Sequence, residues 1–208
     1  ISDGVALKLK KREKKTLNQI CSFAGVGIHS NQSITLLCRP SFSNTGIRFL
    51  YNKEDLEPVI FKVKSDYIGI SHLRSTQLEA KGFNLQTVEH FLAACYLTGI
   101  TDLDIEIDAL ELPIMDGSAL SVYERFLDVG LKQIGEDETD AMVIKRPCVY
   151  VFDKGIGFYL FPDELSRFSY ILDYEHPQIG VRQAHFCLKE AGEAEKKKQA
   201  SARTFGFL

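Results

Sequence analysis

The spacing of apolar residues changes along this chain, and that change limits the possible folds more than any other feature. Residues 34–38 form an apolar run of strand-forming residues. From Leu85 to Tyr96 the apolar residues instead repeat at helical spacing, and Gly99 follows as a helix stop. Residues 103–108 then alternate between apolar and acidic side chains, which predicts a strand with one buried face. Strands followed by helices indicate an α+β fold rather than a doubly wound α/β fold.

The other predicted elements fit the same fold class. Ser118 is placed to begin a second helix, and Gly130 to end it. A polar helix rich in Glu, Lys and Ala is predicted at 188–202. The remaining predicted strands lie at 47–51, 59–63, 71–78, 142–144, 149–152, 158–161, 169–174 and 182–187.

These patterns divide the chain into four parts. Residues 1–15 form a basic arm that we expect to be flexible. Residues 16–135 contain enough strands and helices for one complete α+β domain, and the acidic stretch 136–140 reads as a linker. Residues 141–208 supply strands but only one helix to cover them, so we expect a partial, truncated second domain.

Composition excludes several classes of protein. A net charge of −3 over 208 residues argues against nucleic acid as a partner. The five cysteines are scattered and contain no C-x-x-C pair, so they indicate neither a zinc ribbon nor a disulfide framework. A reducing cytoplasm fits this cysteine usage best. No apolar stretch reaches the roughly 18 residues of a membrane span, so we expect no stable membrane insertion.

Glu89 and His90 are the strongest candidates for chemistry. Neighbouring helical side chains point about 100° apart, but near a helix N-terminus both can reach a ligand beyond the helix end. A metal held by the imidazole would carry a water that the carboxylate deprotonates. A solvated surface pair has the same spacing, so the residues alone leave both interpretations open.

Three further motifs stand out. The run Gly25-Val26-Gly27 lacks the third glycine of a dinucleotide loop, so we interpret it as a bend or a site of close strand packing, and the following His29 as structural. Residues 115–118, Met-Asp-Gly-Ser, predict a tight turn and a helix cap. In the run 203–207, Arg-Thr-Phe-Gly-Phe, the Thr204 hydroxyl can donate to an oxyanion, but the residues alone favour a strand end with a buried Phe.

Taken in order, these four motifs resemble one family closely. It is the zinc-dependent UDP-(3-O-acyl)-N-acetylglucosamine deacetylase family of lipid A and lipopolysaccharide biosynthesis (the LpxC family), and the resemblance runs from about Thr16 to Leu208. It implies two similar domains, each a β-sheet packed on helices in a two-layer sandwich, with the active site between them. It also implies a cytoplasmic hydrolase that acts on a UDP-linked acylated amino sugar.

The resemblance assigns roles to single residues. Glu89 matches the general base and His90 one of three zinc ligands. Thr204 matches the hydroxyl that stabilises the tetrahedral intermediate, and Phe205 the ring that packs on the nucleotide. Leu73 belongs to a stretch that matches a small inserted sheet forming a wall of the substrate site.

The chain departs from the family in its remaining zinc ligands. The family supplies a His and an Asp from a His-Lys-x-x-x-Asp helix, and a later His as the acid; none of these is present. We therefore expect a missing C-terminal segment to complete the zinc shell, and the 208 residues alone to be inactive. Two alternatives are a catalytically dead module that binds nucleotide sugars or acyl groups, and a nucleic-acid module, which the balanced charge disfavours.

Overall fold

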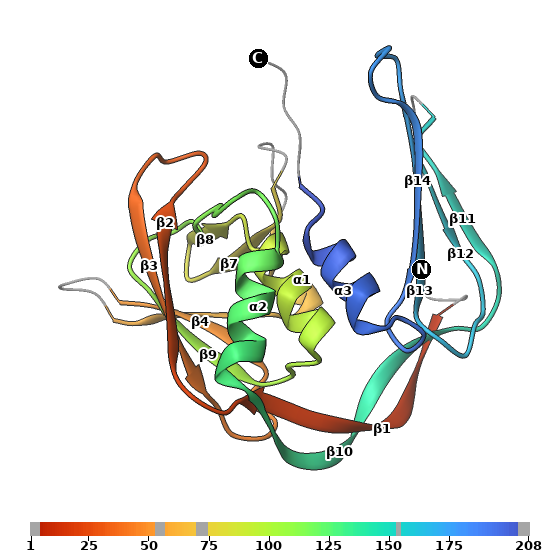
Figure 1. Cartoon of the computed structure of the whole chain (residues 1–208). Helices are drawn as coiled ribbons and strands as arrows, with labels where there is room; N and C mark the ends of the chain where they lie inside the picture. Colours follow the sequence, from red (N-terminus) through yellow and green to blue (C-terminus); the bar gives the residue numbers. More distant parts are fainter. Residues whose placement is uncertain (1–4, 53–56, 70–74, 153–154, 204–208) are drawn as a thin grey trace. The chain divides into compact units, whose positions relative to one another are not determined.

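The computed structural model describes residues 5–52, 57–69, 75–152 and 155–203 (Figure 1). The chain divides into two compact units. We call residues 13–135 with 197–208 the core unit, and residues 1–12 with 136–196 the sheet unit. The described residues confirm a mixed α+β fold.

A five-stranded mixed sheet forms the centre of the core unit. The strand order is β2 (Cys21–Val26), β3 (Ser33–Pro40), β9 (Leu103–Ile107), β4 (Ile47–Tyr51) and β5 (Val59–Lys62). The strands β4 and β9 pair in parallel, and the other neighbours are antiparallel. Burial alternates along β9 and β5, as expected for a sheet with one covered face, so the strand predictions are confirmed here.

Two helices lie side by side and pack on this sheet (Figure 1). They are α1 (Glu89–Thr98) and α2 (Leu120–Val129). Phe91 of α1 makes edge-to-face contacts with Phe23 of β2 and Phe126 of α2, at centroid distances of 6.2 and 5.5 Å. Gly99 ends α1 with φ 76°, a left-handed conformation that favours glycine, so the predicted helix stop is confirmed.

A small antiparallel sheet is inserted before α1. It consists of β6 (Ile68–Gly69), β7 (Gln77–Ala80) and β8 (Phe83–Gln86), and the short 3-10 helix Ser65–Tyr67 precedes it. Of the strand predicted at 71–78, the last two residues belong to β7, and residues 71–74 lie outside the described residues.

The expected basic arm and acidic linker are both replaced by long strands. β1 (Val5–Leu17) pairs with β10 (Leu131–Ile144) in a two-stranded sheet. At its core end, β1 buries Thr16 and Leu17 completely, and the Lys15 carbonyl accepts the Thr101 N–H at 2.9 Å. These contacts hold the end of β1 in the core unit, whereas the many lysines of residues 1–15 predicted a flexible arm.

The sheet unit contains two two-stranded antiparallel sheets in its described part. They are β11 (Cys148–Val151) with β12 (Gly157–Leu160), and β13 (Arg167–Tyr174) with β14 (Gly180–Cys187). The helix predicted at 188–202 is shorter: α3 is Glu193–Ala200, and its residues from Lys197 group with the core unit. Many apolar side chains of the sheet unit are exposed, including Val151, Phe158, Phe161, Tyr170, Ile171 and Val181.

None of the helices in the described part of the chain is long and apolar enough to cross a membrane.

Candidate functional site

Glu89 and His90 occupy the first two positions of α1, where the sequence places them. Both side chains are only partly buried, because the next residue, Phe91, takes the core-facing position. The carboxylate Oε2 of Glu89 accepts the backbone N–H of Thr76 at 3.0 Å. This bond ties the helix start to the segment just before β7 of the small sheet.

The second residue before α1 has a strained backbone. Thr87 has φ 61°, which is unusual for a β-branched residue, and it is 3% exposed. Its Oγ1 has no hydrogen-bond partner among the described residues. Strained residues and unpaired buried groups concentrate at functional sites because the surrounding structure must hold them there.

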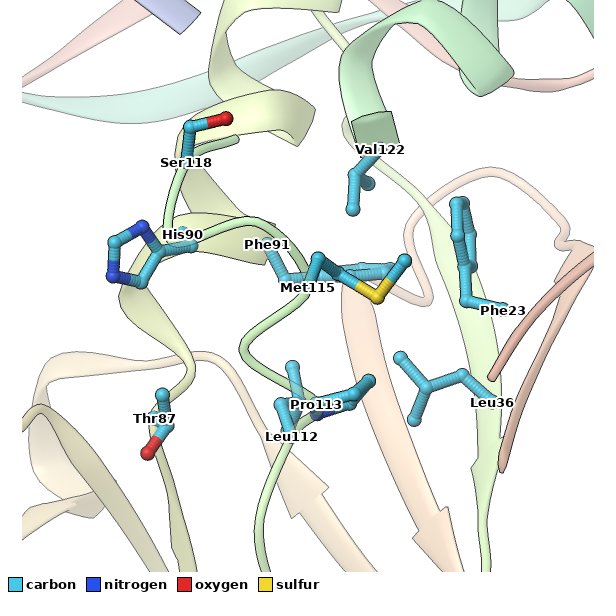
Figure 2. A pocket seen from close by; sticks show the side chains of 10 residues that line it. All are labelled: Phe23, Leu36, Thr87, His90, Phe91, Leu112, Pro113, Met115, Ser118 and Val122. Carbon is cyan, nitrogen blue, oxygen red and sulfur yellow. The ribbon is translucent and has the colours of Figure 1, made fainter. Parts of the chain in front are cut away.

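A small cavity adjoins His90 (Figure 2). Its volume is about 10 Å³, which is room for roughly one water molecule. The wall is mostly apolar and is formed by Phe23, Leu36, Thr87, His90, Phe91, Leu112, Pro113, Met115, Ser118 and Val122. The cavity brings the helix start together with the Met-Asp-Gly-Ser motif, but it is far too small for a nucleotide sugar.

The Met-Asp-Gly-Ser motif forms the predicted turn. Asp116 Oδ1 accepts the Ser118 N–H at 3.2 Å and the Ser118 hydroxyl at 2.6 Å. The Ser118 Oγ in turn accepts the Leu120 N–H at 3.1 Å at the start of α2. Gly117 has φ 80°, so this turn requires a residue that tolerates positive φ.

Asp116 also makes a contact that sequence reasoning did not find. Its Oδ2 accepts a bond from Arg203 Nη2 at 2.8 Å. The Ser118 hydroxyl, together with the Arg203 guanidinium, lowers the pKa of Asp116 to about 2. The ion pair fixes the residue directly before Thr204 beside the motif at 115–118. The sequence does not indicate that Asp116 and Arg203 pair, because they are 87 positions apart.

Glu111 is a second residue that the sequence analysis missed. It is 4% exposed, and its two carboxylate oxygens accept the backbone N–H groups of His29 and Ser30, both at 2.8 Å. Burial raises the pKa of Glu111, but the bonds from Ser30 and from the two backbone N–H groups outweigh burial, so the pKa is lowered overall. The carboxylate therefore ties the loop after β2 to the segment between β9 and the Met-Asp-Gly-Ser motif.

Gly25, within β2, and Gly27, in the loop after it, allow close packing, as predicted. A Cβ on Gly27 would collide with the Glu111 carboxylate and the Ser30 hydroxyl. A Cβ on Gly25 would lie 2.9 Å from the Cβ of Pro113. The side chain of His29 is exposed, and only its backbone takes part in the clamp.

The described residues do not complete a zinc site. No group of three or more His, Cys, Asp or Glu side chains gathers among them that could hold a metal ion. His90 has a suitable donor and a position at an accessible helix start, but zinc in a catalytic site needs three protein ligands. The other predicted site residues, Leu73, Thr204 and Phe205, lie outside the described part of the chain.

Comparison with known proteins places the chain in a family. The family model described as "LpxC: UDP-3-O-acyl N-acetylglycosamine deacetylase" matches residues 14–208, and the chain therefore belongs to this family.

Among curated relatives, the UDP-3-O-acyl-N-acetylglucosamine deacetylases of Pasteurella multocida and Photobacterium profundum are each 33% identical to it, over 197 and 196 residues. The enzyme of the same name from Leptospira biflexa is 31% identical over 195 residues. In each case 94% of this chain matches 63% of the relative, so the chain spans less than two thirds of their length.

Proposed function

We propose that the chain is part of a zinc-dependent deacetylase that hydrolyses the N-acetyl amide of UDP-(3-O-acyl)-N-acetylglucosamine in lipid A biosynthesis, in the cytoplasm. The observation that carries the proposal is the position of Glu89 and His90 at the first turn of α1, in a chain that matches the family from residue 14 to 208. In metal-assisted amide hydrolysis, one residue binds the metal that activates a water, and a neighbouring base removes the proton of that water.

Each residue has one task in this proposal. The Glu89 carboxylate takes a proton from the attacking water, and the bond from the Thr76 N–H orients it. The Thr204 hydroxyl donates to the oxygen that becomes negative as the amide carbonyl is attacked. Phe205 and Leu73 contact the substrate. Bound zinc would supply Lewis acidity, with His90 as one of its ligands.

The remaining zinc ligands lie, in this proposal, in a C-terminal segment outside the 208 residues. The matched length, which is 63% of the relatives, supports this view. The same segment would supply the acid for the leaving amine and the pocket for the acyl chain.

Zinc binding gives the first test. We expect the isolated 208-residue chain to lose zinc on dialysis and to show negligible deacetylase activity, as measured by elemental analysis and product release. A longer version that carries a His-Lys-x-x-x-Asp helix should retain one zinc per chain. Stoichiometric zinc in the isolated chain would contradict the proposed ligand count.

Catalytic roles are tested in the longer version. Glu89→Gln removes the base without changing volume, and kcat should fall by about 10²–10⁴-fold. The matched control is Glu57→Gln, whose side chain is 90% exposed, and its kcat should not change. If Glu89→Gln left kcat intact, the base would have to be another residue.

Thr204→Val keeps the side-chain shape but removes the donor. Loss of one oxyanion donor typically lowers kcat by about 10²–10³-fold, and KM should stay within a few-fold because the charge develops only in the transition state. A raised KM with unchanged kcat would make Thr204 a binding contact instead. A longer version that binds UDP sugar and zinc but releases no acetate would favour the catalytically dead binding module.

A further inference from the structure

Two buried thiols oppose each other across neighbouring strands of the core unit. Cys21 on β2 and Cys38 on β3 are direct partners in the antiparallel register. Directly opposed residues in such a pair have Cα atoms about 4.5 or 5.5 Å apart, and a disulfide needs about 4.4–6.8 Å. Both possible Cα separations fall within the range that a disulfide needs.

Their side chains also point the same way. Cys21 is 3% exposed and Cys38 is fully buried, so both lie on the covered face of the sheet. Each thiol shifts the pKa of the other, so the two groups lie close together. No disulfide joins them, and all five cysteines of the chain are free. The two thiols are thus adjacent and reduced.

The two thiols differ in reactivity. A bond donated by the Cys38 thiol, with a smaller contribution from the Arg125 charge, lowers the pKa of Cys21 despite its burial. Burial raises the pKa of Cys38 well above its ordinary value. Burial raises the pKa of Cys95 similarly. Because the thiolate is the reactive form, Cys21 is the nucleophile, and it lies on an edge strand of the sheet.

We propose that Cys21 and Cys38 form an oxidisable dithiol, a modification site that hydrogen peroxide converts into an intramolecular disulfide. The Cys21 thiolate attacks one peroxide oxygen, the O–O bond breaks, and a sulfenic acid and hydroxide result. Cys38 then gives up its proton and attacks the Cys21 sulfur. The S–S bond forms as the sulfenic hydroxyl leaves, and in total two thiols are oxidised while one peroxide becomes two waters.

The disulfide would fasten an edge strand that supports the candidate site. Phe23, two residues after Cys21, contacts Phe91 in the first turn of α1. The bond closes a loop from residue 21 to residue 38, and it should raise the thermal midpoint of the isolated chain by roughly 5–10 °C. Reduction with dithiothreitol should reverse that shift.

Peptide mapping tests the proposal directly. The reduced native chain is treated with equimolar hydrogen peroxide, alkylated and digested with trypsin. Trypsin should release residues 16–48 as one peptide, because Arg39 precedes Pro40 and resists cleavage, and this peptide contains Cys21 and Cys38 alone. We expect it to be lighter by two hydrogens and unalkylated, and cleavage after Phe23 by chymotrypsin should leave the two halves joined.

Two variants define the order of events. Cys38→Ala removes the resolving thiol, so Cys21 should accumulate as sulfenic acid that dimedone labels. Cys95→Ala is the matched control, since it removes a buried thiol of the same core and should still form the disulfide. The wild-type map needs no variant, so a misfolded Cys38→Ala chain would not weaken the test.

The proposal is overturned if the native chain yields peptide 16–48 with both cysteines alkylated while the half-buried Cys148 is oxidised. It is equally overturned if the disulfide forms only after the chain is unfolded in denaturant. In either case the opposed cysteine pair would be a packing feature without redox chemistry.

Discussion

The two units bury their apolar residues to very different degrees. In the core unit four large aromatic side chains, Tyr123, Phe49, Phe61 and Phe126, are at most 1% exposed. In the described part of residues 136–196, the buried apolar side chains are Phe186 and Cys187, whereas Phe158 is 61% exposed and Ile171 is 65% exposed. Buried apolar area is the main source of stability, so folding of the core unit is largely self-sufficient.

The comparison has a consequence for function. Every described residue of the candidate site belongs to the core unit, including the Glu111 clamp and the pair of Asp116 with Arg203. In the sheet unit the strands pair in antiparallel register, but many of their apolar side chains are exposed. Two-stranded sheets are only marginally stable unless something packs on them. The well-packed core unit therefore holds the described residues of the candidate site in place. The sheet unit exposes apolar side chains to solvent.

The largest expected effect comes from truncating one phenylalanine in each unit. Phe126→Ala leaves a cavity among Phe23 and Phe91, so the free energy of unfolding should fall by about 3–5 kcal/mol. Phe158→Ala removes an exposed ring and should cost under about 1 kcal/mol. Urea denaturation of the isolated chain measures both. A cost for Phe158→Ala as large as that for Phe126→Ala would show that this sheet is covered in solution.

An intermediate effect is expected at the carboxylate clamps. Glu111→Gln places an amide N–H₂ group against backbone donors in a buried site, and it should lower the free energy of unfolding by about 1–3 kcal/mol. The control is Glu190→Gln in the sheet unit, which breaks the exposed pair with Arg167 and should leave the urea midpoint nearly unchanged. Equal midpoints for the two variants would mean that the loop after β2 does not depend on Glu111.

The smallest effect concerns the titration of Asp116. Its pKa of about 2 lies below the ordinary 3.8, so the folded state gains stability above pH 4, and this gain is lost as the pH falls from about 4 through about 2. Arg203→Gln should raise the pKa part of the way toward 3.8, because the bonds from Ser118 remain. Carboxyl carbon NMR shifts against pH would measure this change.

The control for this titration is Lys197→Gln, which removes a cation paired with Glu124 at 2.5 Å. Its effect on the pKa of Asp116 should be negligible. An unchanged pKa in Arg203→Gln would assign the whole shift to Ser118 and remove the argument that Arg203 fixes the segment before Thr204.

Local patterns in the sequence predicted much of the core unit. The strand predicted at 47–51 has the observed bounds of β4, and Gly99 marked the end of α1. β1 was missed, and β10 was predicted only at residues 142–144, because charged residues are frequent in the rest of both strands and their pairing depends on partners far along the chain. Glu111 and Arg203 were missed for the same reason: their partners are 81 or more positions away, and only the folded topology brings them together. The roles of Leu73, Thr204 and Phe205 stay predictions.

The return of the chain to the core unit after Lys197 has a consequence for its synthesis. The N–H of Ala119, at the start of α2, donates to the carbonyl of Ala200 at 3.0 Å, and these residues are 200 − 119 = 81 positions apart. At about 5–20 residues per second, a ribosome needs roughly 4–16 s to make the intervening chain. During that interval the nascent core unit lacks this hydrogen bond while residues 136–196 of the sheet unit are translated.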